Sequence, residues 1–254
     1  FVLYRCCLVM KVYNEMIILQ SKRYRNLAKL EYHNRLLGKV SKFLIHDISS
    51  SLSVITGSIY LIKKKCLGKR ERSKSIDILM ETFNYIEDIL NSSVSLVKTD
   101  SQIEMFDPDE NVNSVLKMSA GRLKNAGIVL ETNLEGGCLL RGCVSDYTRL
   151  VFNILINSVE ELESLDRQGH IWVCSCTKGD EYVLSIRDNG RGINPEVLKI
   201  LEKGNVVDSR NENIGLGMFY IFNTVEAEFK GKVKINTGCN VGTEVICYLP
   251  FVDK

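Results

Sequence analysis

The feature that most constrains the fold is a pair of long apolar stripes in the first hundred residues. Between about residues 24 and 97, apolar side chains recur at spacings of three, four and seven, which keeps them on one face of a helix. A polar, basic break from Lys63 to Lys74, with Gly68 inside it, separates the stripes and predicts a helical hairpin. The first stripe is Leu30, Leu37, Val40, Leu44, Ile48, Leu52, Ile55, Ile59 and Ile62, and the second is Ile76, Leu79, Phe83, Ile86, Leu90 and Val97.

Two helical arms with one narrow stripe each cannot enclose both stripes by themselves. A second copy of the chain would complete a four-helix bundle, so we expect a homodimer. The alternative is a simple coiled-coil spacer, which gives no role to the histidine at position 46.

From about Gln102 onward, short strands and helices alternate. Asp107 and Pro108 indicate a helix start before residues 111–125, and further helices are expected at residues 146–163, 195–202 and 216–226. Such mixing, with adjacent hairpin strands late in the chain, favours an α/β sandwich, so the whole chain is expected to be α+β. The expected strands are residues 128–132, 170–176, 182–187, 232–236 and 244–249.

One helix of this second half carries two asparagines four residues apart. Asn153 and Asn157 should project from the same helical face. Two amide oxygens there could ligate Mg²⁺, an ion that prefers oxygen ligands and keeps waters and phosphates in its shell. Two solvent-facing asparagines on an amphipathic helix remain the alternative for this pattern by itself.

Three glycine-containing segments could form the rest of a nucleotide site. Asp188 follows a predicted strand and precedes Gly190 and Gly192; its carboxylate could accept a hydrogen bond from an amine such as that of adenine, and the glycines allow close backbone approach. A helix is expected to begin at Gly215, Leu216 and Gly217, and the backbone N–H groups of its N-terminus could bind phosphate. Thr243 follows Gly242 and could hydrogen-bond toward the base. The segment from residue 194 to 214 is interpreted as a lid. 

In this order and spacing, the four segments resemble the ATP-binding fold shared by histidine kinases, DNA gyrase, the Hsp90 chaperones and MutL. The resemblance covers roughly residues 104 to 252. It implies a mixed sheet with helices packed on one face, and ATP and Mg²⁺ as cofactors. The residues that it assigns to the nucleotide are Asn153, Asn157, Asp188, Gly190, Gly192, Gly215, Leu216, Gly217 and Thr243, with Asn153 and Asn157 also as metal ligands.

The residue four positions before Asn157 separates kinases from ATPases in this superfamily. In the ATPase members this position resembles a glutamate that activates water. This chain has Asn153 there. An amide has no basic site near neutral pH, so it cannot act as a general base. This substitution favours a kinase and argues against an ATP-driven machine of the gyrase or Hsp90 kind.

The helical hairpin supplies a phosphate acceptor. The segment from Phe43 to Leu52 resembles the H box of histidine kinases, with His46 as phosphoacceptor, Asp47 orienting its ring and Ser50 assisting dephosphorylation of the partner. His46 lies two residues from seam positions on either side, about 200° around the helix, so it should face outward. A neutral imidazole nitrogen is a good nucleophile near pH 7.

Two positions depart from the family pattern. Ser51 stands where the family usually has proline, which predicts a helix without a proline kink. Glu160 stands where lysine is frequent, and Lys203 or Arg210 could replace that phosphate contact. A degenerate scaffold that only relays phosphate is therefore the alternative to an active kinase.

The resemblance implies a phosphoryl relay between proteins. The chain would phosphorylate His46 from Mg·ATP and pass the group to an aspartate of a response-regulator receiver domain. We expect an N-terminal segment at residues 1–22, a dimerisation and phosphotransfer hairpin at 23–99, and an ATP-binding domain at 104–252.

Composition narrows the partners and the compartment. A net charge of +2 is too close to neutral to suggest a nucleic acid or an anionic membrane as a partner. The 9 cysteines include no zinc-finger spacing, and we expect them to be reduced, as in the cytoplasm. No signal peptide is visible, and the apolar start, residues 1–10, is too short to span a bilayer, so we expect membrane attachment only through a missing upstream part.

Overall fold

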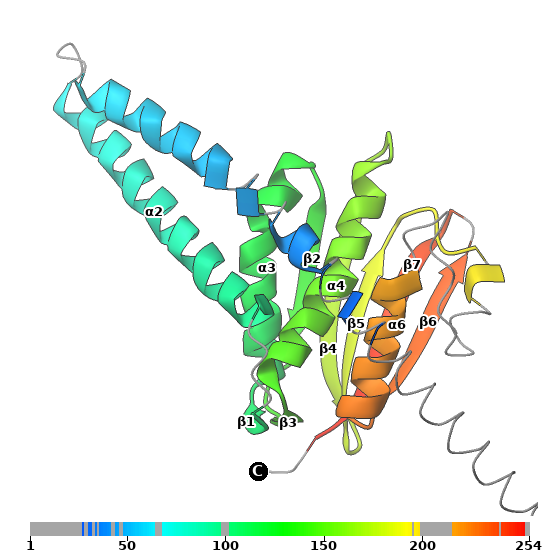
Figure 1. Cartoon of the computed structure of the whole chain (residues 1–254). Coiled ribbons are helices and arrows are strands. Elements are labelled where there is room, and N and C mark those ends of the chain that lie inside the picture. The colour runs from blue at the N-terminus through cyan, green and yellow to red at the C-terminus, as the bar shows by residue number, and fades with distance from the viewer. Residues whose placement is uncertain are drawn as a thin grey trace, which may run out of the picture. The chain divides into compact units, whose positions relative to one another are not determined.

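The structure is a computed structural model (Figure 1) that describes residues 27, 30–31, 34, 36–41, 44–45, 48–63, 68–97, 102–194, 196–198, 215–238 and 240–251. The chain divides into two compact units, residues 1–39 and residues 40–254. In the first unit the described residues are all helical. Within the described residues, no helix has both the length and the hydropathy that crossing a membrane requires.

The second unit begins with the predicted helical hairpin. Residues 48–63 form one uninterrupted helix, and α2 follows at Lys69–Val97. The Gly68 amide donates to the Glu71 carboxylate over 3.1 Å, which satisfies a backbone group at the start of α2. The helix therefore begins inside the segment expected as a break, because most of residues 69–74 are good helix formers.

The described part of the hairpin buries three serines beside a few apolar residues and leaves several large apolar residues exposed. Ser51, Ile55, Ser58 and Ser75 are buried. Several members of the two predicted stripes are instead about half exposed in the single chain, although apolar surface in water is unfavourable. These exposed members are Leu30, Leu52, Ile59, Ile76, Phe83 and Leu90.

A five-stranded mixed sheet forms the centre of the second half, as the resemblance implied. Its order is β2-β4-β5-β7-β6; β2 runs parallel to β4, and the other neighbours are antiparallel. A separate two-stranded sheet, β1 with β3, was not predicted, since strands of three residues carry too little alternation to recognise. The strands are β1 Glu104–Phe106, β2 Val129–Leu134, β3 Leu140–Gly142, β4 His170–Lys178, β5 Glu181–Asp188, β6 Lys232–Gly238 and β7 Gly242–Pro250.

Three helices cover one face of this sheet: α3 at Pro108–Asn125, α4 at Val144–Glu163 and α6 at Gly215–Asn223 (Figure 1). The expected start of α3 is confirmed, because the Asp107 carboxylate accepts from the Asp109 amide over 2.9 Å. The last expected helix ends differently, since a π-helical turn, η1 at Thr224–Glu228, follows α6. Of the expected helix at 195–202, residues 196–198 are helical and the remainder lie outside the described residues.

The core lies between α4 and the inner face of the sheet. Along α4 all but six of the residues are buried, and β4, β5 and β7 present alternate buried positions to them. A buried polar chain crosses this core: the Tyr147 hydroxyl donates to that of Tyr182, which donates to Asp109 over 2.6 Å. The residues that contribute most to the apolar interior are Leu150, Phe152, Leu155, Ile171, Val173, Leu184, Ile186, Val245 and Cys247.

Leu184→Ala should destabilise this domain, because Leu184 is fully buried on the central strand β5. Removing a buried leucine side chain costs about 2–5 kcal/mol of unfolding free energy. Trp172, the one tryptophan, lies on β4 and reports urea unfolding by fluorescence. Val129→Ala, on the exposed part of β2, is the control, and equal losses of stability in both variants would contradict this description of the core.

Candidate functional site

The carboxylate of Asp188 lies at the end of β5 and is almost completely buried. One of its oxygens accepts from the Gly190 amide over 2.8 Å and the Thr243 amide over 3.2 Å, and the other accepts from the Ser158 hydroxyl over 3.0 Å. Burial raises the pKa of Asp188, and the three donors oppose this rise. Donors from α4, from the loop after β5 and from β7 thus fix the Asp188 carboxylate in place.

Backbone shape around Asp188 depends on two glycines with positive φ. Gly242 has a φ of 102°, and a Cβ there would collide with the carbonyl oxygen of Asp188. Gly192 has a φ of 84°, and a Cβ there would collide with the carbonyl oxygen of Gly238. Only glycine adopts such conformations at little cost, so the predicted glycine positions are required by the turn that surrounds Asp188.

An ion pair fastens the first glycine segment to α4. Glu161 accepts from the Arg191 side chain over 2.8 and 3.1 Å and from its amide over 3.0 Å. The hydrogen bond from Arg191 holds the pKa of Glu161 below its ordinary value. Sequence reasoning missed this pair, although Glu161 lies four residues after Asn157, on the same face of the helix.

Thr237 on β6 joins the glycine loop to the turn between β6 and β7. Its hydroxyl donates to the Gly242 carbonyl over 3.0 Å and accepts from the Ile193 amide over 2.9 Å. The hydroxyl of Thr243 lies 3.4 Å from that of Thr237. Thr243, a predicted site residue, therefore contacts both Asp188 and Thr237, whereas Thr237 itself was not identified from the sequence.

The two asparagines of α4 have different surroundings. Asn153 is buried, and its amide nitrogen donates to the Arg149 carbonyl over 2.9 Å, so it is not a solvent-facing residue. Asn157 is partly exposed, and its amide lies about 3.5 Å from the position that a Cβ of Gly217 would take. The structure thus brings Asn157 beside the glycines that open α6.

Other predicted site residues are described less fully. Gly215 and Leu216 are helical residues of α6. Ser50 is helical and exposed, whereas His46 and Asp47 lie outside the described residues, as does the lid except for residues 194 and 196–198. Within the described part of the chain, no group of three or more His, Cys, Asp and Glu residues could hold a metal ion.

Comparisons with known proteins agree with this geometry. Residues 143–253 match the family model described as "Histidine kinase-, DNA gyrase B-, and HSP90-like ATPase". Sporulation kinase D of Bacillus subtilis is 26% identical over 236 residues, which cover 91% of this chain and 44% of that protein. The first curated relatives are matched over about half of their length or less.

Solved structures of histidine kinases share the fold. The catalytic domain of histidine kinase ThkA has a TM-score of 0.50 at 17% identity, covering 60% of this chain and 99% of that domain. ThkA in complex with the response regulator protein TrrA has a TM-score of 0.50 at 18% identity, covering 85% of this chain and 62% of that one.

We predict that Asp188→Asn weakens ATP binding much more than GTP binding, because the lost acceptor would face the amine of a bound adenine. A hydrogen bond to a charged acceptor contributes about 1.5–3 kcal/mol, or roughly ten- to a hundredfold in affinity. Calorimetry with Mg²⁺ and a non-hydrolysable ATP analogue measures this. Asp180→Asn, at the other end of β5, is the control, and an unchanged ATP affinity in Asp188→Asn would remove Asp188 from the site.

Proposed function

Because the chain belongs to the histidine kinase family, a family of ATP-dependent kinases, we propose that it transfers the γ-phosphoryl group of ATP to its own His46 and then to an aspartate of a response regulator. The domain boundaries that fit this role are residues 1–22 for an N-terminal segment, 23–99 for the dimerisation and phosphotransfer hairpin, and 104–252 for the ATP-binding domain.

The observation that carries this proposal is the buried carboxylate of Asp188 with its three donors. A fixed, desolvated acceptor at the end of a strand is suited to the exocyclic amine of adenine, which donates and does not accept. Since the donors come from α4, the glycine loop and β7, the pocket is organised before the nucleotide arrives, which lowers the cost of binding.

The phosphate end of the pocket would lie between α4 and α6. The start of α6 offers unpaired backbone N–H groups to phosphate, and Asn157 lies beside Gly217 there. Asn157 fits an oxygen ligand of Mg²⁺, and Asn153 is its proposed companion one turn earlier. When bound, Mg²⁺ neutralises phosphate charge.

The side chain of Asn153 supports a kinase over an ATPase. It is buried and its nitrogen donates to the helix backbone, so it offers no base that could activate water. The γ-phosphoryl group would then await another acceptor. An imidazole nitrogen of His46 attacks the γ-phosphorus, the bond to the β-phosphate oxygen breaks, and ADP leaves with that electron pair.

The helix on both sides of His46 is compatible with its role as acceptor. Leu44, Ile45 and Ile48 are helical, and Ser49 and Ser50 are exposed, so small polar side chains follow the histidine. We propose that Asp47 holds the second ring proton of His46. Ser50 is proposed to position water for dephosphorylation of the partner.

Two partners are proposed, a second copy of the chain and a response regulator. The exposed Leu52, Phe83 and Leu90 would be buried by a second hairpin in a homodimer. Histidine kinase ThkA was crystallised with a response regulator protein, which supports a receiver domain as the second substrate. 

A degenerate phosphate-relay scaffold is the second candidate. Glu160 replaces a frequent lysine, and Ser51 replaces a frequent proline, in a helix that is unbroken over residues 48–63. Absence of Mg·ATP binding together with phosphate acceptance from a partner would favour this candidate.

Incubation with ATP labelled at the γ-phosphate should label the protein with a group that acid removes and alkali retains, because a phosphoryl group on imidazole is a phosphoramidate. His46→Gln should abolish the label and keep Mg·ATP binding, whereas the control His170→Gln, on β4, should keep both. An acid-labile label on His46→Gln would place the acceptor elsewhere. Phosphoserine, which resists acid, would also contradict the assignment.

Phe83→Glu, and likewise Leu44→Glu, should shift the chain from dimer to monomer in light scattering. Each puts an unpaired charge into an apolar seam, which costs several kcal/mol. Asn84→Glu adds the same charge to a neighbouring exposed position and should leave the dimer intact. A monomer in the unmodified chain would rule out the four-helix bundle.

A further inference from the structure

The guanidinium of Arg149 joins the end of the hairpin to the nucleotide-binding domain. It is buried, and its Nε donates to the Leu96 carbonyl in the last turn of α2 over 3.0 Å. Its other nitrogens donate to Asp146 over 3.1 Å and to the Ser145 hydroxyl over 3.3 Å, both in the first turn of α4. One side chain therefore links a helix C-terminus, where unpaired carbonyls favour a cation, to the start of the next domain's central helix.

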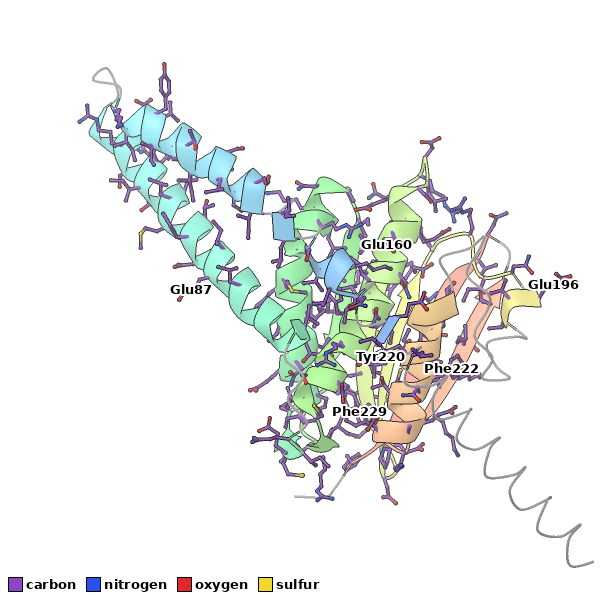
Figure 2. All side chains as sticks on the ribbon, viewed as in Figure 1. Glu87, Glu160, Glu196, Tyr220, Phe222 and Phe229 are labelled. Atoms are coloured by element: carbon purple, nitrogen blue, oxygen red, sulfur yellow. The ribbon has the colours of Figure 1, made fainter. Side chains whose placement is uncertain are left out.

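The same contacts extend to α6. The Tyr220 hydroxyl lies 3.4 Å from the Asp146 oxygen that Arg149 also contacts, and donates to it. Tyr220 lies three residues after Gly217, on the side of α6 next to α4 (Figure 2). Burial raises the pKa of Tyr220, so its phenol keeps the proton that it donates. A continuous polar path thus runs from the end of α2 to the helix that the second glycine segment opens.

Arg149 also lies close to the nucleotide residues along α4 without being one of them. Its carbonyl accepts from Asn153, and Asn157 follows one turn later, about 12 Å along the helix from Arg149. Figure 1 shows the C-terminal end of α2 beside α3 and α4, which agrees with the contacts between these helices. The guanidinium therefore holds the end of α2 at a fixed distance from the proposed pocket.

The covalent connection alone would orient the domain poorly. Six residues separate the end of α2 at Val97 from the start of β1 at Glu104. A flexible chain of six residues has a root-mean-square end-to-end distance of about 13 Å, and it does not fix an orientation. Phosphoryl transfer needs the attacking nitrogen and the phosphorus about 3 Å apart and in line, so orientation matters.

We propose that Arg149 is a positioning residue that holds the nucleotide-binding domain on the end of α2 and so sets the direction from which the pocket approaches the phosphoacceptor helix. This inference rests on the proposed function of the pocket and deepens it. Loss of the anchor lowers the time that the pocket spends in line with the acceptor, whereas it leaves the pocket's own groups in place. The rate then falls while nucleotide affinity stays the same.

The test compares Arg149→Gln with Arg122→Gln in the full chain. Arg122 pairs with Glu163 over 2.6 and 2.7 Å, so the control also removes a bidentate arginine contact of α4, but one made to α3 and not to α2. For Arg149→Gln we expect autophosphorylation at saturating Mg·ATP to fall at least tenfold, with KM and the calorimetric Kd of ATP changed less than threefold. Arg122→Gln should change the rate less than threefold. 

A purely structural role gives other results. An equal loss of rate and of ATP affinity in Arg149→Gln, or an unchanged rate, would overturn the proposal. If Arg149→Gln does not fold, the Tyr220→Phe variant is tested in its place. This substitution removes the hydroxyl that contacts Asp146 and keeps the aromatic ring. We then expect a smaller fall in rate, about threefold, at constant Kd, and an unchanged rate in a folded Tyr220→Phe would count against the path.

Hydrogen–deuterium exchange separates this inference from the kinase assignment, because it needs no phosphoryl transfer. Amides in residues 90–97 should exchange faster in Arg149→Gln than in the unmodified chain and at an unchanged rate in Arg122→Gln. If the unmodified chain shows no autophosphorylation, the proposed function fails, and exchange alone then decides whether Arg149 holds α2. Unchanged exchange at residues 90–97 in folded Arg149→Gln would show that it does not.

Discussion

The hydrogen bonds to the buried carboxylate of Asp188 are the interaction on which the proposed nucleotide pocket depends. They draw together α4, the glycine loop and β7, three segments far apart in the sequence. A buried carboxylate without such donors would carry a large desolvation cost, so the donors stabilise the fold and fix the acceptor at once. Position 242 requires glycine for a related reason, since any Cβ there would collide with the backbone carbonyl of Asp188.

Helix α4 is the element that relates this pocket to the rest of the chain. One face contacts the pocket through Asn157, Ser158 and Glu161, while its first turn contacts α2 through Arg149. Its remaining residues fill the core above the sheet. A rigid helix with these separate contacts can hold the pocket and the end of the hairpin at a constant spacing, as the proposed phosphoryl transfer between the two domains requires.

Much of this arrangement could be predicted from local sequence patterns. The cap at Asp107 and the glycine positions follow from turn chemistry and motif order, and the mixed sheet was implied by the resemblance to the ATP-binding fold. The contacts of Ser158, Glu161 and Thr237 could not, because their partners lie 30 to 44 residues away and local periodicity contains no information about them. Glu161 could have been suspected from its place one turn after Asn157 on the same face.

The central claim is that the pocket delivers the γ-phosphoryl group to the protein and not to water. A single-turnover experiment with Mg·ATP, in which ADP, free phosphate and protein-bound phosphate are measured together, tests it most directly. We predict that ADP and protein-bound phosphate form at equal rates, with free phosphate appearing only later and more slowly. Release of free phosphate in step with ADP, with none bound to the protein, would contradict the account.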